Sequence, residues 1–123
     1  MITKIVAVDD EESIRRLVKL ALESEGYECH IAAEGDEGLR IIRAVGPSIV
    51  LLDVMMGKRD GFEIADEIRA DPNLKDITII MLSARDRDLG TLDGRTKLPD
   101  VNEYLSKPFD LKELIGTVKK YSG

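Results

Sequence analysis

The chain has few of the residues and segments that mark secreted, membrane or zinc-binding proteins. It contains one cysteine, Cys29, so no disulfide can form within the chain, as is usual in a reducing compartment. It has no cluster of cysteine and histidine that would favour zinc or copper. No apolar run approaches the roughly 20 residues of a membrane-spanning helix, and residues 1–4 lack the start of a signal peptide. We therefore expect a cytoplasmic protein.

Positive charge is also in short supply. Lysine and arginine total 18 against 24 aspartate and glutamate, a net charge of −6, so nucleic-acid phosphates should be repelled and direct binding to them is not expected. The 43% of hydrophobic and 34% of charged residues are the balance of a soluble globular protein. We find no internal repeat and no low-complexity segment. A chain of 123 residues has room for one domain with a proper core, and we expect a single domain over residues 1–123.

Short apolar runs alternate with segments of helical period, a pattern typical of repeated strand and helix units. Three runs are almost continuously apolar and rich in β-branched residues, which predicts central parallel strands buried on both faces: residues 5–8, 49–52 and 77–82. Two weaker candidates, residues 27–32 and 103–106, carry more polar side chains and are predicted at the sheet edges.

Apolar residues with helical spacing predict amphipathic helices between and after these strands. Two sets have the full spacing and two are shorter: Ile14, Leu17, Val18 and Ala21; Leu111, Leu114, Ile115 and Val118; Leu39 and Ile42; Phe62, Ala65 and Ile68. Gly26, Gly46-Pro47 and Asp71-Pro72 are predicted to stop the helices before them. Residues 85–100 have no sustained apolar face, so the fourth helix is expected to be short or irregular.

Together these elements predict an α/β protein with a flavodoxin-like fold: an open five-stranded parallel sheet of order 2-1-3-4-5, with helices on both faces and right-handed crossovers. Such sheets bind ligands at the carboxyl ends of their strands. Polar residues stand at those ends, with Asp9 and Asp10 after the first strand and Asp53 after the third. Ser83 follows the fourth strand and Lys107 the fifth.

The three aspartates are expected to meet, because the first and third strands are neighbours in this order. Like charges about 4 Å apart repel by roughly 4 kcal/mol at an effective dielectric constant of ~20, which favours either protonation or a bound metal. A site of oxygen ligands that stays open to water and phosphate suits magnesium better than calcium, zinc or copper. The sequence therefore predicts a Mg²⁺ site formed by Asp9, Asp10 and Asp53.

Five short segments carry a family resemblance. They are Val8-Asp9-Asp10-Glu11, Asp53-Val54-Met55-Met56, Asp60-Gly61-Phe62, Leu82-Ser83-Ala84 and Tyr104-Leu105-Ser106-Lys107-Pro108-Phe109. From Ile5 to about Val118 the sequence resembles the receiver domain of two-component response regulators, in particular the single-domain chemotaxis regulators. Each segment alone is weakly specific, whereas an acidic pair, a central aspartate, a hydroxyl residue and Lys-Pro in this order form a highly specific set.

The resemblance implies that Asp53 accepts a phosphoryl group and becomes 4-aspartylphosphate. It implies that Asp10 and Asp53 hold Mg²⁺ directly, with the main-chain carbonyl of Met55 as third ligand and Asp9 acting mainly through water. Negative charge spreads over the phosphoryl oxygens during transfer, and Mg²⁺ together with the Lys107 ammonium would neutralise it.

Ser83 and Tyr104 are the switch residues that the resemblance implies. The Ser83 hydroxyl would donate to a phosphoryl oxygen, and Tyr104 would rotate inward as that loop moves. A cis peptide is implied at Lys107-Pro108. The implied partner is a sensor histidine kinase or phosphotransfer protein, while the cognate kinase, the downstream target and the phosphoryl lifetime stay open. We expect a phosphoacceptor that assists its own phosphorylation and dephosphorylation rather than a conventional enzyme.

Each site residue also has a purely structural interpretation. Asp9 and Asp10 could cap the first helix, Asp53 could be a turn residue, and Ser83 could cap the segment that follows it. An isolated Lys107 would be taken for a surface lysine. The two acidic clusters together favour the functional interpretation.

Other residues are expected to be structural or to depart from the family. The side chains of Met55 and Met56 are predicted to fill the core, and Cys29 and His30 to serve an edge strand. Gly57 stands where many receivers have proline, which leaves the loop of Met55 freer and places metal affinity in question.

The segment before Tyr104 departs from the family as well. Residues 98–103 stand where the family commonly has Gly-Ala-Asp before the aromatic residue. The surface that binds downstream partners is therefore not predicted from the resemblance. We predict that residues 85–100 are the most mobile part of the domain and that phosphorylation orders them.

Two other functions remain as alternatives. A flavodoxin-like enzyme would bind a flavin phosphate on the same fold, but it needs a cradle rich in glycine, serine and threonine after the first strand, where this chain has four acidic residues. A pure interaction module would dock on partners without phosphorylation. The joint presence of Asp10, Asp53, Ser83 and Lys107 argues against that second alternative.

Overall fold

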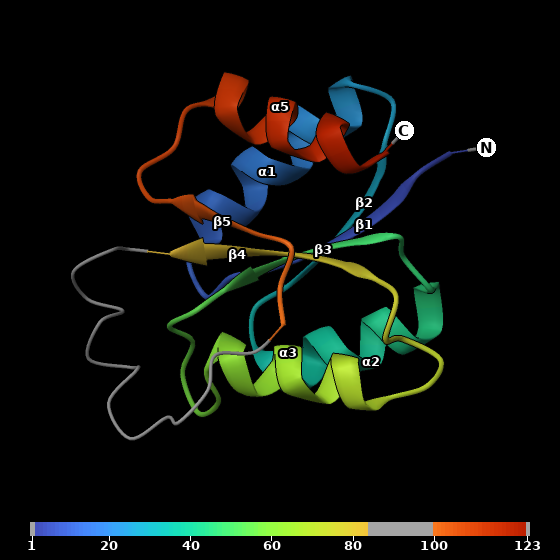
Figure 1. Ribbon diagram of the computed structural model, residues 1–123. Helices are drawn as coiled ribbons and strands as arrows, with labels where there is room; N and C mark the ends of the chain where they lie inside the picture. The colour runs from blue at the N-terminus through green and yellow to red at the C-terminus, as the bar shows by residue number, and fades with distance from the viewer. Residues whose placement is uncertain (1, 84–99, 123) are drawn as a thin grey trace.

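The computed structural model describes residues 2–83 and 100–122. Its five strands form one parallel sheet in the order β2-β1-β3-β4-β5, and Figure 1 shows helices above and below it. The elements in chain order are β1 (Lys4–Val8), α1 (Glu12–Ser24), β2 (Glu28–Ala32), α2 (Gly35–Val45), β3 (Ile49–Asp53), α3 (Gly61–Ala70), β4 (Thr78–Ser83), β5 (Glu103–Ser106) and α5 (Leu111–Ser122). The predicted α/β class, flavodoxin-like fold and strand order are confirmed.

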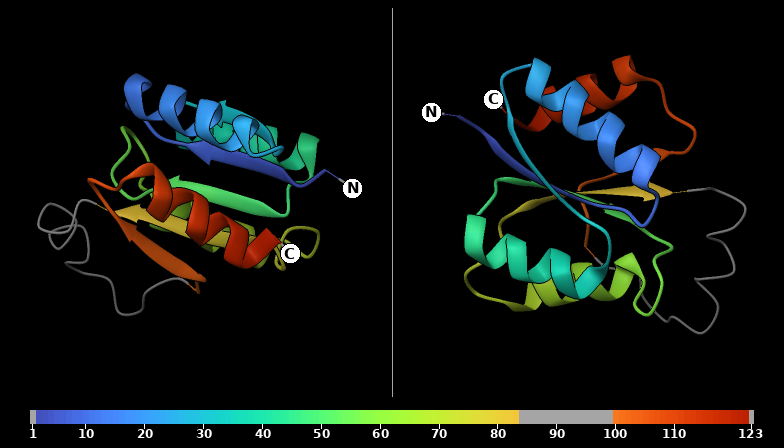
Figure 2. Two further views of the ribbon diagram at one scale, coloured as in Figure 1. Left: turned by 90° about the horizontal axis from the view of Figure 1, so that it is seen from above. Right: turned by 180° about the vertical axis from the view of Figure 1, so that it is seen from behind.

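Alternation along the strands divides the core into two layers, because successive side chains of a strand point to opposite faces. Val6, Val50 and Ile79 belong to the cluster that α2 and α3 cover. Their neighbours Ile49 and Ile80 belong to the cluster under α1 and α5. Figure 2 shows these two helix pairs on opposite sides of the sheet. Both faces of the central strands are therefore buried, as their continuous apolar runs predict.

The helices end where the sequence predicts. Gly46 follows α2 in the left-handed conformation, and α1 and α3 end before Gly26 and Asp71. At the start of α3 a reciprocal capping box forms, in which Asp60 accepts from the Glu63 amide and Glu63 accepts from the Asp60 amide. This capping box therefore fixes the first turn of α3.

The two strands predicted at the edges, β2 and β5, do lie there. Cys29 is buried on β2, and His30 Nε2 lies 2.8 Å from Glu28 Oε2 on the same strand. Both residues therefore contribute to the structure of the edge strand, as predicted. The predicted irregular fourth helix and mobile segment fall almost wholly within residues 84–99, outside the described residues. No helix among the described residues is long and apolar enough to cross a membrane.

The carboxyl ends of the strands meet on one side of the molecule. In Figure 1 the arrows of β4 and β5 point to that side, and both chain ends lie on the other side, as Figure 2 also shows. The polar residues that follow the strands are thus brought together, away from the ends of the chain.

Candidate functional site

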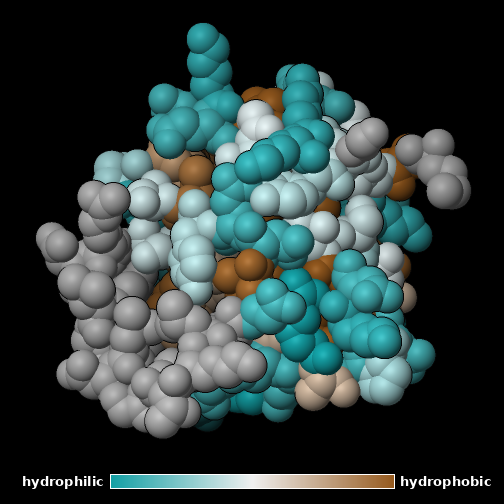
Figure 3. Space-filling model, in the orientation of Figure 1, coloured by the Kyte–Doolittle hydropathy of each residue, from teal (hydrophilic) through white to brown (hydrophobic). Residues whose placement is uncertain are grey.

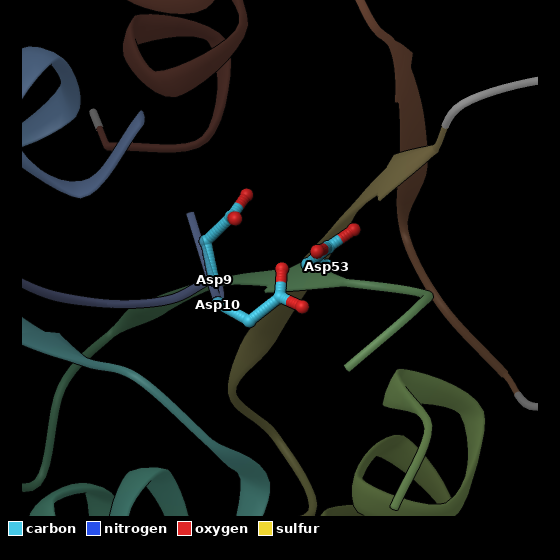
Figure 4. Close-up of side chains that lie close together, drawn as sticks. All are labelled: Asp9, Asp10 and Asp53. Atoms are coloured by element: carbon cyan, nitrogen blue, oxygen red, sulfur yellow. The ribbon is translucent and has the colours of Figure 1, made fainter. Parts of the chain in front are cut away.

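Three carboxyl groups meet above the ends of β1 and β3. Asp9 and Asp10 directly follow β1, Asp53 ends β3, and one carboxylate oxygen of each lies within 4.8 Å of the others. Figure 4 shows the three side chains reaching into this space from the two neighbouring strands. Asp9 and Asp53 are buried, with 1% and 0% of their surface exposed, whereas Asp10 is exposed. The predicted convergence is confirmed.

Lys107, which follows β5, provides the positive charge of the cluster. Its ammonium lies 2.7 Å from Asp9 Oδ2, 3.4 Å from Asp53 Oδ1 and 3.4 Å from Glu11 Oε1, and its side chain is 9% exposed. Burial lowers the pKa of Lys107, but its contacts with Asp9, Asp53 and Glu11 outweigh burial and leave the pKa above its ordinary value. Lys107 is therefore a charged and largely enclosed partner of the aspartates, not a surface lysine.

Asp53 has an unusual carboxyl group. Burial is the main cause that raises its pKa to about 7, the negative charge of Asp9 adds to the rise, and Lys107 opposes it. Neither of its carboxylate oxygens accepts a hydrogen bond from the part of the chain that the structure describes. A buried carboxylate that lacks hydrogen bonds is costly, and the ion pair with Lys107 at 3.4 Å offsets this cost only in part, so the site favours a proton, a cation or a covalent modification at Asp53.

Asp9 is held by four contacts on different atoms. Its Oδ1 accepts from the Glu11 amide at 2.9 Å, its amide donates to the Ala32 carbonyl at 3.1 Å, and its own carbonyl accepts from Arg15 at 2.9 Å. The fourth contact is the ion pair with Lys107. The capping interpretation of Asp9 and Asp10 is wrong, because Glu11 is the N-cap of α1 and no side chain caps this helix; Asp9 instead shapes the turn before α1 and belongs to the acidic cluster.

Ser83 and Tyr104 lie on adjacent strands. Ser83 ends β4, and its carbonyl accepts from the Lys107 amide at 2.8 Å, which ties the end of β4 to the turn after β5. Tyr104 on β5 pairs in register with Met81, and its side chain is 44% exposed. The peptide bond between Lys107 and Pro108 is cis, as the family resemblance implies.

Met55 lies in the loop between β3 and α3, beside the aspartates. A cavity of about 410 Å³ opens there, lined by Asp10, Met55, Met56, Gly57, Lys58, Asp60 and Glu63. The helix beyond approaches closely, since a Cβ on Gly61 would collide with the Asp53 carbonyl. The start of α3 therefore packs directly on the strand end that carries Asp53.

Two side chains that shape the site were not predicted from the sequence. Glu11 contacts Lys107, and Arg15 binds the main chain of Asp9. Arg15 follows Glu11 by one helical turn at the start of α1, so helical spacing would have indicated that both face the acidic turn.

The donor set fits a hard divalent cation. Asp10 and Asp53 offer carboxylate oxygens without cysteine or histidine nearby, and the two oxygens of Asp53 lack hydrogen bonds from described residues. Met55 lines the cavity beside them. A metal can therefore bind at the acidic cluster, with oxygen ligands of the kind that Mg²⁺ prefers.

Known proteins similar to this chain share its fold. The family model of the response regulator receiver domain matches residues 5–119. The chemotaxis response regulator CheY4 of Vibrio cholerae is 30% identical, with 98% of this chain and 99% of that chain covered and a TM-score of 0.86. The N-terminal domain of a response regulator receiver protein from Methanoculleus marisnigri is 28% identical, with 100% and 98% covered and a TM-score of 0.73.

A longer protein contains a similar domain. NtrX from Brucella abortus is 28% identical and has a TM-score of 0.83, and the match covers 98% of this chain but 27% of that chain. The same fold thus occurs both in chains of similar length and as part of a larger protein.

Proposed function

The chain belongs to the response regulator receiver domain family, and we propose that it accepts a phosphoryl group on Asp53 from a sensor histidine kinase or phosphotransfer protein. Receiver domains are phosphoacceptor switches of two-component signalling rather than conventional enzymes. The main support for Asp53 is its buried carboxyl group, whose oxygens accept no hydrogen bond from described residues at the centre of the acidic cluster. We propose further that residues 1–123 form one domain that acts in the cytoplasm.

In the proposed reaction an oxygen of Asp53 attacks the phosphorus of a phosphohistidine. The P–N bond breaks, and its electron pair returns to the imidazole of the donor. Asp10, Asp53 and the main-chain carbonyl of Met55 would hold Mg²⁺, with Asp9 acting mainly through water. Bound Mg²⁺ supplies positive charge that favours ionised Asp53 and offsets the charge of the phosphoryl oxygens.

Lys107, Ser83 and Tyr104 would report the modification to the surface. A phosphoryl group on Asp53 offers new acceptors to the Lys107 ammonium, now shared among carboxylates, and to the Ser83 hydroxyl. The Lys107 amide donates a hydrogen bond to the Ser83 carbonyl, so movement at the end of β4 would be transmitted to the turn after β5. Tyr104, on β5 just before Lys107, would then turn inward.

Intact mass after incubation with acetyl phosphate and Mg²⁺ tests the proposal. We expect a single phosphate adduct on the wild type and on Asp76→Asn, an exposed acidic control, and none on Asp53→Asn, because the amide is a far poorer nucleophile and metal ligand. Circular dichroism should show the same fold for all three proteins. An adduct that persists in Asp53→Asn would place the phosphoacceptor elsewhere.

A further inference from the structure

The loop between β3 and α3 is anchored at both ends by main-chain hydrogen bonds, and its Met56 side chain is buried in the core, whereas Gly57 and Lys58 are exposed. The Val54 amide donates to the Leu82 carbonyl at 3.0 Å, and the Gly61 amide donates to the Val54 carbonyl at 2.8 Å. Between these anchors Gly57 is exposed, has a φ of +21°, and has no atom within 4 Å of the position where a Cβ would stand. Proline requires a φ near −65°, so it cannot stiffen the backbone at position 57, and restraint of the exposed half of the loop must come from side-chain contacts.

Arg59 supplies such contacts. Its guanidinium lies 2.7 Å and 3.3 Å from the two oxygens of Glu67, 2.9 Å from Asp36 Oδ1 and 3.6 Å from Glu63 Oε2. Glu63 and Glu67 occupy successive turns of α3, whereas Asp36 lies in the first turn of α2. One side chain of the loop therefore contacts carboxylates of both helices that cover this face of the sheet.

The contacts differ in strength. Two guanidinium nitrogens contact the two oxygens of Glu67, which is the strongest arrangement for such a pair. Asp36 is 68% exposed and its contribution is weaker, whereas the Arg59 side chain is 25% exposed. The floor under this network is tightly packed, since a Cβ on Gly35 would lie 2.7 Å from Ile64 and 3.7 Å from the Cβ of Arg59.

We propose that Arg59 is a positioning residue for metal binding, which holds the loop so that the Met55 carbonyl faces the acidic cluster. Met55 precedes Arg59 by four residues, and the loop between them forms a wall of the cavity that Asp10 also lines. The proposal rests on the proposed function, because it takes Asp10, Asp53 and Met55 as the ligands. It assigns to Arg59 the restraint that the glycine at position 57 does not provide.

The direction of the effect separates positioning from simple electrostatics. Removing a positive charge near an acidic site should strengthen cation binding by Coulomb attraction alone. Loss of a restraint on a ligand should weaken it. We expect Arg59→Gln to weaken Mg²⁺ binding about three- to tenfold, less than the roughly 10- to 100-fold effect of removing a group that directly orients a ligand. Arg59→Lys should fall between, since an ammonium cannot match two carboxylate oxygens at once.

Arg43→Gln is the matched control. Arg43 Nε lies 3.7 Å from Asp71 Oδ2. This pair joins the carboxyl-terminal ends of α2 and α3, whereas the loop with Arg59 lies at the amino-terminal end of α3. The change removes the same charge, but we expect Mg²⁺ affinity to be unchanged or slightly higher. Glu67→Gln should weaken binding like Arg59→Gln, and the double variant should lose little more than either single change.

To test this, each unphosphorylated protein is titrated with Mg²⁺ alone while its amide chemical shifts are monitored by NMR. Thermal melting compares the stability of the variants. Weaker binding in Arg59→Gln at a melting temperature similar to that of Arg43→Gln supports positioning. Equal or tighter binding in Arg59→Gln, while Asp10→Ala loses binding, overturns the role of Arg59 and leaves the proposed site intact. Undiminished binding in Asp10→Ala would instead refute the ligand set, and the inference with it.

Discussion

The carboxyl group of Asp53 makes the stability of the metal-free protein depend on pH. Its pKa is raised from 3.8 to about 7, so its contribution to stability is fully present below about pH 4 and is lost as the pH rises through 7. This difference corresponds to an upper bound of about 4 kcal/mol. In the absence of divalent metal, we expect Asp53→Asn to be more stable than the wild type at pH 7.5 and to lack this component of the pH dependence.

Urea denaturation from pH 4 to pH 8 with a chelator present would measure it. The comparison of the two proteins cancels the titration of all other groups, and added Mg²⁺ should reduce the difference because it offsets the buried charge. If the two free energies of unfolding run parallel across this range, Asp53 is ionised at little cost and its described surroundings do not set its pKa.

The Lys107 ammonium is shared among carboxylates, which predicts two effects of Lys107→Ala. Phosphorylation by acetyl phosphate with Mg²⁺ should persist but be slower by about 10²-fold, because one cation that offsets phosphoryl charge is lost. The phosphorylated variant should also be poorly coupled to the switch. The rate of adduct formation by mass spectrometry checks the first effect, with the exposed Lys112→Ala as control. A variant as fast as the control would remove Lys107 from the reaction.

At this scale the sequence predicted which residues meet but not how they are arranged. Strand order alone places Asp9, Asp10 and Asp53 together, because it depends on apolar runs that are easily recognised. Helical spacing indicates only that Glu11 and Arg15 face the acidic turn; the atoms they contact depend on the rotamers of long side chains, which a linear pattern does not contain. The same is true of Arg59, which the sequence presents only as a charged loop residue.

Among the elements, α3 is the one whose position most directly affects the site. Its first residue, Gly61, packs on the Asp53 carbonyl, and a Cβ there would also lie 2.9 Å from Met81 Cε. We expect Gly61→Ala to cost about 1–3 kcal/mol of stability and to weaken Mg²⁺ binding, since α3 and the loop before it must move away from β3. Chemical denaturation and Mg²⁺ titration measure the two effects.

Gly116→Ala is a control within α5. Gly116 is exposed in the helix, with no atom within 4 Å of a new Cβ, so alanine should stabilise the protein by about 0.5–1 kcal/mol without a change in Mg²⁺ binding. Destabilisation by both substitutions to a similar extent would mean that the close approach at Gly61 has no special cost.

Most element boundaries could be predicted because the signals are local. Apolar runs set the central strands, and Gly46 and the residues after α1 and α3 end the helices at the expected places. The fourth strand begins at Thr78 and extends to Ser83, one residue later at each end than the apolar run suggests. This shift follows from pairing with β3, where Thr78 is opposite Ile49, a tertiary contact that a local pattern does not contain.

For the whole molecule, Mg²⁺ should act as a stabilising ligand that links two neighbouring central strands. Binding that requires the folded site raises the free energy of unfolding by about 1.4 kcal/mol when the free ion is at ten times its dissociation constant. We expect the melting temperature to rise with Mg²⁺ concentration in the wild type and to stay nearly constant in Asp10→Ala. A similar rise in both proteins would indicate that the ion acts through general charge screening.

The surface agrees with the 34% share of charged residues. The face seen in Figure 3 is mainly hydrophilic, with hydrophobic residues in small separate patches. The net charge of −6 attracts cations at long range, which adds to the local attraction of the acidic cluster. The sequence predicted this overall character because composition determines it, whereas the identity of the signalling partner depends on surface details that composition does not fix.

The placement of the two chain ends gives the fold different resistance to force at each end. β1 is paired in parallel with β2 on one side and with β3 on the other, so a pull on the amino end loads both hydrogen-bonded ladders in shear. The carboxyl end continues from α5, a helix that packs on the sheet through apolar side chains such as Leu114 and Val118 and is tied at its last turns by ion pairs of Lys119 and Lys120, so a pull there breaks side-chain contacts one after another and not a main-chain ladder in shear. An unfoldase that pulls proteins through a pore should therefore unfold this domain more readily from its carboxyl end.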